Sequence, residues 1–400
     1  MDKKVTDNFD LAVIGAGASG LMAAAAASAK GLKVALLEKN SEAAKKIYAT
    51  GSGRCNFLNA DADASFYSSN SDSDAYAFAE AVMEAAGPDR LLEVFSDAGV
   101  LAAEEDEGRM YPRSGQASAI ASALIRMAEG ATLFTGFEVK TAARKTEGFG
   151  IEAADGRVVN ARKLLIACGG KAGIQYGSDG RGYKLAECFG HKVNKPIPAL
   201  TALIPEEDIS ALAGVRASAF VNFLKNDNGK DQLLAMNEYG EVQFTKDAVS
   251  GICVMNQSRF VRLSEGCAYK LLLDFMWDYE RDELEEMLRE REALLGKDKL
   301  LQSMVPDRLA DYILNGSKDI KETAKRLKGL AFTIVNTKGW PNAQVTAGGI
   351  DISEIDPETM ESRLVPGLYF AGEVIDIDGP CGGFNLTWAF ATGLIAGENA

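Results

Sequence analysis

Histidine is almost missing from this chain: His191 is the single one among 400 residues. A Ser-His-Asp hydrolase needs a placed imidazole, and a histidine-rich zinc site needs more than one, so neither class is expected. His191 follows a predicted helix and Gly190. Since a cation is favourable at a helix C-terminus, this position favours an ordinary helix-end residue over a catalytic one.

Paired cysteines are also missing. None of the six forms a C-x-x-C pair or shows the spacing of metal ligands. We therefore expect no metal site, and the pattern is typical of a protein of the reducing cytoplasm. The six are Cys55, Cys168, Cys188, Cys253, Cys267 and Cys381.

Positive charge is in the minority, with 43 Lys and Arg against 57 Asp and Glu and a net charge of -14. Such a chain repels a phosphate backbone and is not drawn to an anionic membrane, so neither nucleic acid nor a membrane is expected as partner. The charge-free run from Leu11 to Ala29 has the length of a membrane span. Its glycines and alanines make it less apolar than a span, and Asp7 and Asp10 before it argue against a signal peptide.

That run predicts a dinucleotide-binding turn. Residues 9–14 form an apolar strand, and an alanine-rich helix follows to about Lys30. Between them, Gly15 allows a tight turn, Gly17 lets a pyrophosphate approach the main chain, and Gly20 lets helix and strand pack closely. The helix N-terminus then faces the anion. The candidate contacts are Gly15, Gly17, Ala18, Ser19 and Gly20.

A second predicted strand, Lys33 to Leu37, ends in Glu38, 18 residues beyond Gly20. An acid there binds the adenosine ribose hydroxyls and disfavours a 2′-phosphate. Glu38 and Lys39 are therefore candidate cofactor contacts, with a merely structural glycine turn as the alternative. The fingerprint alone does not choose between FAD and NAD.

The far end of the chain favours a flavin. Residues 367–373 form a short apolar strand ending in Gly372 and Glu373, and Gly382-Gly383 open an apolar helix to about Gly397. Backbone N–H groups at such a helix start can meet the flavin pyrimidine carbonyl, which gains charge on reduction. The alternative is a last strand and a capped helix that only complete the sheet. Gly169, after a third apolar strand, either approaches the cofactor or makes a turn.

These residues resemble the BaiN-like bacterial FAD-dependent oxidoreductases, an aminoacetone oxidase family, over nearly the whole chain. The matching pieces are Thr50 to Asn56, Gly108 to Pro112, Gly182-Tyr183, Thr346 to Gly349 and Met360 to Trp388. The chain departs from the family at Ser52, Arg181 and Cys381. The resemblance implies that the first piece lies along the flavin, that Glu373 lies near the ribityl-phosphate arm, and that residues 383–386 lie at the pyrimidine edge. The implied contacts are Thr50, Gly51, Gly53, Arg54, Cys55, Asn56, Glu373, Gly383, Phe384, Asn385 and Leu386.

The middle of the chain predicts an insertion. Three prolines from Pro196 to Pro205 suit a domain crossing, and strand-like patches follow at residues 220–224, 241–245 and 269–275. Residues 281–295 and 307–330 predict three helices, and their charged side chains are most simply explained as the solvent-facing side of each helix. The predicted fold is α/β: a Rossmann-like, glutathione-reductase-type FAD-binding domain with an inserted β-rich domain and a small helical domain. The expected parts are residues 1–195, 196–275, 276–335 and 336–400.

The predicted function is that of an FAD-dependent oxidoreductase acting on a small organic substrate. A second G-x-G-x-x-G is absent from the sequence, so NAD(P)H is a candidate only as a transient electron donor. NAD(P)H-linked reduction and amine oxidation both remain open, and a flavin-binding redox sensor without turnover is the alternative. Candidate polar groups at the ring are Arg54, Asn56, Arg109 and Tyr111. Arg109 either anchors an acidic substrate or pairs with the acids at residues 104–107.

Overall fold

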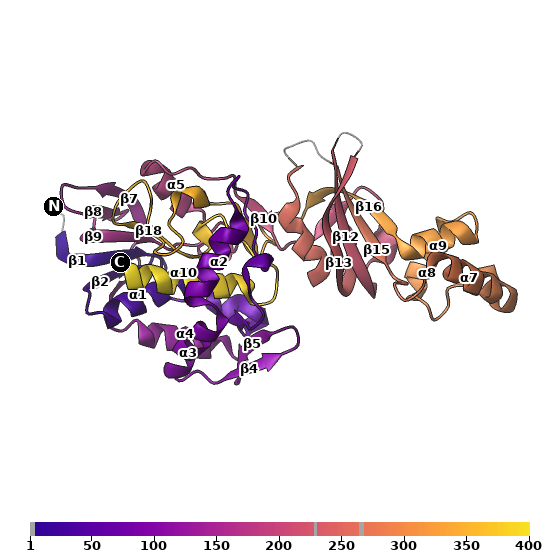
Figure 1. Cartoon of the computed structure of the whole chain (residues 1–400), viewed down its shortest axis with the longest axis horizontal. Helices are drawn as coiled ribbons and strands as arrows, with labels where there is room; N and C mark the ends of the chain where they lie inside the picture. Colours follow the sequence, from indigo (N-terminus) through magenta and orange to yellow (C-terminus); the bar gives the residue numbers. More distant parts are fainter. Residues whose placement is uncertain (1–4, 228–229, 264–267) are drawn as a thin grey trace. The chain divides into compact units, whose positions relative to one another are not determined.

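The computed structural model describes residues 5–227, 230–263 and 268–400. These residues form two compact units, one made of residues 1–197 and 345–400 and the other of residues 198–344 (Figure 1). Both ends of the chain therefore belong to the first unit, and the second unit is an insertion. The chain leaves the first unit in β10 (Ile197–Ala199) and returns in β17 (Val345–Ala347).

The first unit is built on a seven-stranded sheet with the order β6-β2-β1-β9-β8-β7, and β18 pairs with β9. The core of the sheet is parallel: β1 lies between β2 and β9. The first half of β9 pairs antiparallel with β8 and its second half pairs parallel with β18, so Leu164 lies opposite Leu368. The strands are β1 (Val5–Ile14), β2 (Val34–Leu37), β6 (Thr132–Phe134), β7 (Val139–Arg144), β8 (Phe149–Ala153), β9 (Val158–Ile166) and β18 (Leu368–Phe370).

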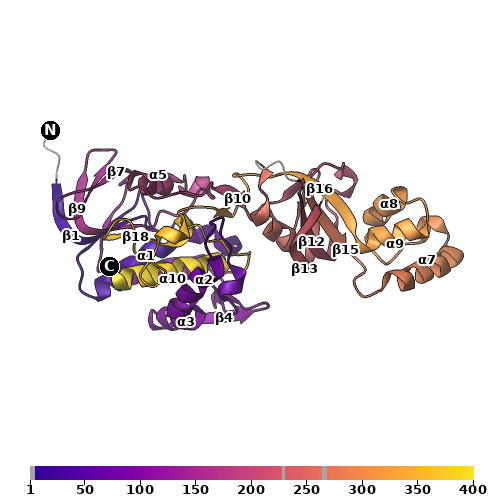
Figure 2. The ribbon, with the colours of Figure 1, turned by 45° about the horizontal axis from the view of Figure 1, so that its top comes forward.

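Small residues set the helix packing in this unit. The first helix, α1 (Ala18–Ala29), and the last, α10 (Phe384–Asn399), lie side by side (Figures 1 and 2). A Cβ at Gly393 would meet the carbonyl oxygen of Ser19 at 2.4 Å, and one at Gly397 would meet that of Ala23 at 2.4 Å. Only glycine permits this approach, which brings the two ends of the chain together.

The remaining elements of the first unit surround the sheet. They include a three-stranded antiparallel sheet, β3-β5-β4, whose strands flank the loop at residues 50–56 and the acidic turn at residues 105–108. Their bounds are β3 (Leu58–Asn59), β4 (Ala102–Glu105), β5 (Arg109–Pro112), α2 (Ala75–Ala86), α3 (Pro88–Asp97), α4 (Ala117–Met127) and α5 (Arg181–Cys188).

The second unit is a closed barrel with the strand order β11-β14-β13-β12-β15-β16. Aromatic side chains fill it: Phe223 and Tyr269 stack at 5.7 Å, and Phe244 and Phe332 meet edge to face at 6.0 Å. Strand β15 alternates buried and partly exposed residues, as a strand with one face in a core does. The strands are β11 (Leu203–Pro205), β12 (Arg216–Asp227), β13 (Lys230–Phe244), β14 (Val249–Ser250), β15 (Ala268–Asp274) and β16 (Leu330–Thr337).

Three helices, α7 (Arg281–Leu295), α8 (Asp307–Asn315) and α9 (Ile320–Lys328), share one hydrophobic core with the barrel. Leu284, Leu309 and Leu327 are buried in that core beside the barrel residues. The expected boundary near residue 275 is therefore not a boundary between compact units, because the helices bury their apolar faces on the barrel and β16 then completes it. Across the described ranges, every helix falls short of the length or apolar character that a bilayer crossing requires.

Candidate functional site

The glycine turn after β1 has the geometry that the fingerprint predicts. Gly15 has a φ of +104°, and a Cβ there would meet the carbonyl oxygen of Ala167 at 2.7 Å. A Cβ at Gly20 would meet the carbonyl oxygen of Gly15 at 1.9 Å. At Gly17, by contrast, a Cβ would meet no described atom within 4 Å apart from its chain neighbours and the local helix backbone. Gly17 caps α1 without a side-chain hydrogen bond, so this face of the turn presents main chain to a ligand.

Glu38 is held against this turn at the end of β2. Its Oε2 accepts from the Ala16 N–H at 2.9 Å, and its Oε1 accepts from the Asn40 N–H at 2.7 Å. Glu38 is 7% exposed, so the carboxylate sits fixed beside the glycines. Lys39 instead pairs with Asp179 at 2.8 Å.

The loop at residues 50–56 has a strained backbone. Gly51, Ser52, Gly53 and Cys55 all have left-handed φ values, at +54°, +55°, +85° and +57°. Ser52, which replaces a usual glycine, therefore adopts a conformation that glycine adopts without cost. Thr50 anchors the start of the loop by donating to the carbonyl oxygen of Ile47 at 2.7 Å.

Asn56 ends this loop and faces the C-terminal turn. Among the described residues its Oδ1 has no hydrogen-bond partner, although it is buried, and it lies 2.9 Å from a Cβ position at Gly383. The same Cβ would meet the carbonyl oxygen of Leu58 at 2.5 Å. A buried amide oxygen beside a glycine at a helix start could accept a hydrogen bond from a polar ligand group.

The two candidate arginines both have acidic partners. The Arg54 guanidinium lies 4.1 Å from the centre of the Tyr111 ring, and its Nη1 is 3.2 Å from the Glu105 carboxylate, which raises the pKa of Arg54. Arg109 donates from Nε to the Asp106 carbonyl oxygen at 2.9 Å and pairs with Glu107 at 3.3 Å. Of the two alternatives for Arg109, the structure therefore agrees with the second, in which the guanidinium pairs with the acidic residues at 104–107.

Cys55 in the loop and Cys168 after β9 are packing residues. Cys55 is fully buried, and burial raises the pKa of its thiol to about 11. Burial likewise raises the pKa of Cys168 to about 12. Neither thiol is a thiolate at neutral pH, which a nucleophilic role requires. Cys267 lies outside the described residues.

The C-terminal strand meets the first glycine turn. Gly372 has a φ of +79°, and a Cβ there would meet the Ser19 Oγ at 2.5 Å. The Ser19 hydroxyl donates to the Ala371 carbonyl oxygen at 3.3 Å, and the Gly372 N–H donates to the Thr392 Oγ1 at 2.9 Å. Three segments that are far apart in the sequence are thereby joined.

Glu373 is the centre of a small polar cluster. Its Oε2 pairs with Lys46 at 2.7 Å, and its Oε1 accepts from the Thr346 N–H at 2.8 Å. A Cβ at Gly169 would lie 3.9 Å from the Glu373 carboxylate, so the glycine after β9 reaches the same place. Sequence reasoning missed Lys46, for which the chain carries no motif, and gave Thr346 no role within its matching piece.

The turn before α10 is closed by Asn385. Its Nδ2 donates to the Gly379 carbonyl oxygen at 2.8 Å, and its Oδ1 accepts from the Gly379 N–H at 2.9 Å. Asn385 therefore shapes the turn with its whole amide. Gly383 caps the helix at a φ of +99° without a side-chain cap, and the Phe384 ring packs against Phe66 with the ring centres 4.5 Å apart and the planes tilted by 30°. Leu386 is half-buried in the first turn of the helix.

Asp376 is a buried carboxyl that lies in the matching piece from Met360 to Trp388 and to which sequence reasoning gave no role. It has no exposed surface; its Oδ2 accepts from Asn194 Nδ2 at 2.8 Å and from the Asn70 N–H at 3.0 Å. Its Oδ1 is also buried and has no hydrogen-bond partner in the part of the chain that the structure describes. Burial raises the pKa of Asp376 to about 6, and the nearby Asp378 adds to the effect.

His191 lies after α5, as predicted, but it is buried between two polar side chains. Its Nδ1 is 3.0 Å from Glu354 Oε2, and its Nε2 is 2.8 Å from the Ser362 Oγ. The Ser362 Oγ also accepts from the Leu364 and Val365 N–H groups, at 3.1 and 2.9 Å. The imidazole side chain has no exposed surface. These residues therefore fasten a loop and do not offer a nucleophile to substrate.

The sequence profile described as "HI0933-like protein Rossmann domain" matches residues 9–399. The chain belongs to the HI0933-like Rossmann family. One curated relative of this HI0933-like chain is a 3-dehydro-bile acid delta(4,6)-reductase from Clostridium scindens, 36% identical with 98% of each chain covered. Ribosomal RNA dihydrouridine synthases from Escherichia coli and Haemophilus influenzae are 28% and 27% identical, with 96% and 95% of each chain covered.

The family settles the class of this protein. The HI0933-like chain is a flavin-dependent oxidoreductase built on a Rossmann-type α/β fold, as the sequence predicted. Its relationship to enzymes over nearly their whole length removes the alternative of a sensor without turnover.

Proposed function

We propose that the first unit holds FAD between the two ends of the chain. The main chain at Gly17 and the α1 N-terminus would take the diphosphate, and Glu38 would take the adenosine ribose hydroxyls. The loop at residues 50–56 and the turn at Gly383 would enclose the ring. The open face at Gly17 and the unsatisfied Asn56 Oδ1 support this fit.

When bound, FAD supplies hydride transfer, and the protein orients the substrate and excludes water. We assign to the chain the reduction of a carbon–carbon double bond conjugated to a carbonyl in a small organic molecule. The observation that carries this choice is the 36% identity to a delta(4,6)-reductase over 98% of each chain. Both kinds of named relative, a reductase and a dihydrouridine synthase, make products with fewer double bonds.

The chain's own residues then divide the work. Asn56, whose Oδ1 lacks a protein donor, would orient the ring edge. Tyr111, with the Arg54 guanidinium 4.1 Å from its ring, would form the polar wall toward the substrate. The electrons would come from NAD(P)H binding transiently, and the substrate would gain a hydride at one carbon and a proton at the other.

A stopped-flow experiment tests this function. The FAD-loaded protein is reduced anaerobically with NADH or NADPH and then mixed with a steroid 4-en-3-one or a simple cyclic enone. In a separate arm, the oxidised protein is mixed anaerobically with aminoacetone. The proposal expects rapid flavin reoxidation by an enone, and a product two mass units heavier. Reduction of the oxidised flavin by aminoacetone, with no response to enones, would instead establish amine oxidation.

Reduction of a uridine in RNA is the second candidate, favoured by the 28% identity to the E. coli synthase over 96% of each chain. The net charge of -14 opposes binding to a long phosphate backbone. Mass analysis of nucleosides from RNA treated with the reduced protein separates the two candidates. Dihydrouridine formation without enone turnover would favour the RNA substrate.

A further inference from the structure

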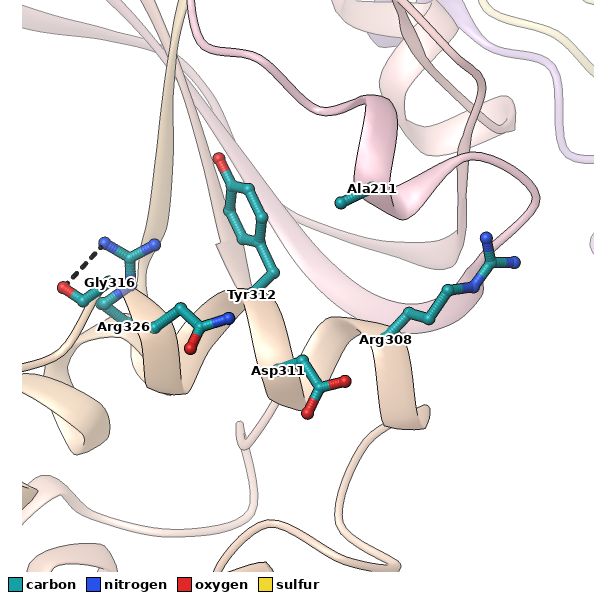
Figure 3. A pocket seen from close by; sticks show the side chains of 7 residues that line it. Ala211, Arg308, Asp311, Tyr312, Gly316 and Arg326 are labelled. Atoms are coloured by element: carbon teal, nitrogen blue, oxygen red, sulfur yellow. Dashed lines mark hydrogen bonds between the residues drawn. The ribbon is translucent and has the colours of Figure 1, made fainter. Parts of the chain in front are cut away.

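A pocket lies wholly within the second unit, and all of its lining residues belong to that unit. It has a volume of about 470 Å³ and is formed by α8, α9 and the short turn at Ala211 (Figure 3). Arg308, Asp311, Tyr312 and Asn315 line it from one face of α8, because their spacing of three and four residues repeats the helix turn. Arg326 enters from α9.

The two arginines are not neutralised by the protein. Figure 3 has them on either side of Tyr312. Within the described ranges, the Arg308 side chain makes neither an ion pair nor a hydrogen bond. Arg326 donates to the Gly316 carbonyl oxygen at 3.4 Å, while its Nε is buried and has no partner among residues 5–227, 230–263 and 268–400. Guanidinium groups in this state are suited to an anion, above all a phosphate.

The α9 segment at one side of the pocket is rich in positive charge, whereas Asp311 in the lining and Glu207 and Asp208 near Tyr312 are negative. Residues 318–328 carry five basic side chains and two acidic ones, in a protein whose net charge is -14. In the part of the chain that the structure describes, the ammonium group of Lys328 pairs with Asp274 at 2.8 Å, whereas Lys318, Lys321 and Lys325 have no ion pair. This local excess of positive charge favours an anionic ligand at α9.

The other lining groups indicate more than a simple anion. The half-buried ring of Tyr312 lies 5.7 Å below the Arg326 guanidinium, which makes a flat wall for an aromatic base. The Asp311 carboxylate and the Asn315 amide have no side-chain partner among the described residues. A carboxylate that accepts from hydroxyls suits a ribose. A ligand that matches all of these lining groups carries an anion for the arginines, hydroxyl donors for Asp311 and a flat ring for Tyr312.

We propose that this pocket binds a nucleoside phosphate, either as a free nucleotide or as a nucleotide within an RNA strand. Arg308 and Arg326 hold the phosphate, Asp311 accepts from the ribose hydroxyls, and Tyr312 contacts the base. The proposal does not depend on the reaction at the flavin, because all of these residues belong to the second unit.

Calorimetric titration of the FAD-loaded full-length protein with UMP, inorganic phosphate and an eight-residue oligouridylate tests the proposal. UMP is expected to bind more tightly than phosphate, and R308Q or R326Q to weaken UMP about tenfold each. Arg308 is exposed, so R308Q keeps the test valid if R326Q unfolds. Arg281→Gln on α7, also exposed, is the matched control and should leave binding unchanged.

The oligouridylate distinguishes the two sources of the ligand. Binding at least about tenfold tighter than UMP, with a steep loss on adding salt, would identify an RNA strand, and equal binding a free nucleotide. A UMP affinity that is equal to that of phosphate, or unchanged in both R308Q and R326Q, would overturn the proposal. Since none of these titrations measures turnover, failure here leaves the enone experiment unaffected.

Discussion

The hydroxyl of Ser19 donates a hydrogen bond over 3.3 Å to the carbonyl oxygen of Ala371, a residue 352 positions later in the chain. Ser19 belongs to the glycine fingerprint, and Ala371 directly follows β18. Gly372 and Gly393 allow the approach, since a Cβ at either would collide with Ser19. The candidate site therefore exists only when the two ends of the sequence are folded against each other.

Gly372→Ala should loosen this junction. The change adds a Cβ 2.5 Å from the Ser19 Oγ at a φ of +79°. Gly31→Ala is the matched control, because its φ is +83° but no atom lies within 4 Å of the new Cβ. We expect G31A to cost about 1–2 kcal/mol from backbone strain alone and G372A clearly more. Urea unfolding of both variants measures the difference, and equal losses would refute a tight junction.

Glu38→Gln should weaken FAD binding. The glutamine amide cannot accept from both the Ala16 and Asn40 N–H groups through two oxygens, so one buried donor loses its acceptor. We expect the dissociation constant for FAD to rise about tenfold or more. Titration of FAD with the cofactor-free protein, followed by the quenching of FAD fluorescence, measures this dissociation constant. Glu42→Gln, at an exposed position nearby, serves as the control, and an E38Q affinity equal to it would contradict the assignment.

The parts of the site that sequence could predict are those made by neighbouring residues. The Gly15–Gly20 turn, Glu38 and the start of α10 are local patterns, and each lies where its pattern predicts. The closure of the barrel depends on pairing between β11 and β16, which are over a hundred residues apart. The Lys46–Glu373 pair and the burial of Asp376 likewise arise from long-range packing, which leaves no mark in a single sequence.

Asp376 should make the protein less stable as the pH rises. Burial raises the pKa of the folded carboxyl to about 6, above its ordinary value of 3.8, so the folded state holds its proton more tightly. Protonated Asp376 therefore adds to the free energy of unfolding, and this contribution is fully present below about pH 4. It is lost as the pH rises through 6, which lowers the free energy of unfolding by up to about 3 kcal/mol. Asp376→Asn should abolish this loss and be at least as stable as the wild type at pH 8.

Denaturant unfolding between pH 4 and pH 8 tests this prediction. Asn194, which donates to Asp376 at 2.8 Å, stays in place in the variant. A wild type and D376N with parallel pH profiles would mean that Asp376 is ionised throughout this range.

The pH dependence of stability that comes from His191 should run in the opposite direction. Burial lowers the pKa of the folded imidazole below its ordinary value of 6.5, although Glu354 opposes the effect. The folded state therefore favours the neutral imidazole. The stability that this neutral form contributes is present above pH 6.5 and is lost as the pH falls through the pKa of His191 in the folded protein. His191→Asn should flatten this acid limb and cost about 1–3 kcal/mol at pH 8, because the bond to Ser362 is lost.

The same variant separates a structural role from a catalytic one. Since the imidazole is buried and Ser362 accepts two backbone N–H groups, the rate of flavin reduction at pH 8 should be unchanged in H191N. A fall in that rate of a hundredfold, with the fold intact, would place His191 in the reaction.

The most direct test of the central claim is the identity of the cofactor that the protein carries. The full-length chain is purified under mild conditions, its absorption spectrum is recorded, and the ligand released by denaturation is identified by mass. The account predicts a yellow protein that releases FAD, and a G372A variant that retains much less of it. A folded, colourless protein that takes up no added FAD would contradict the claim that the joined ends of the chain form a flavin site.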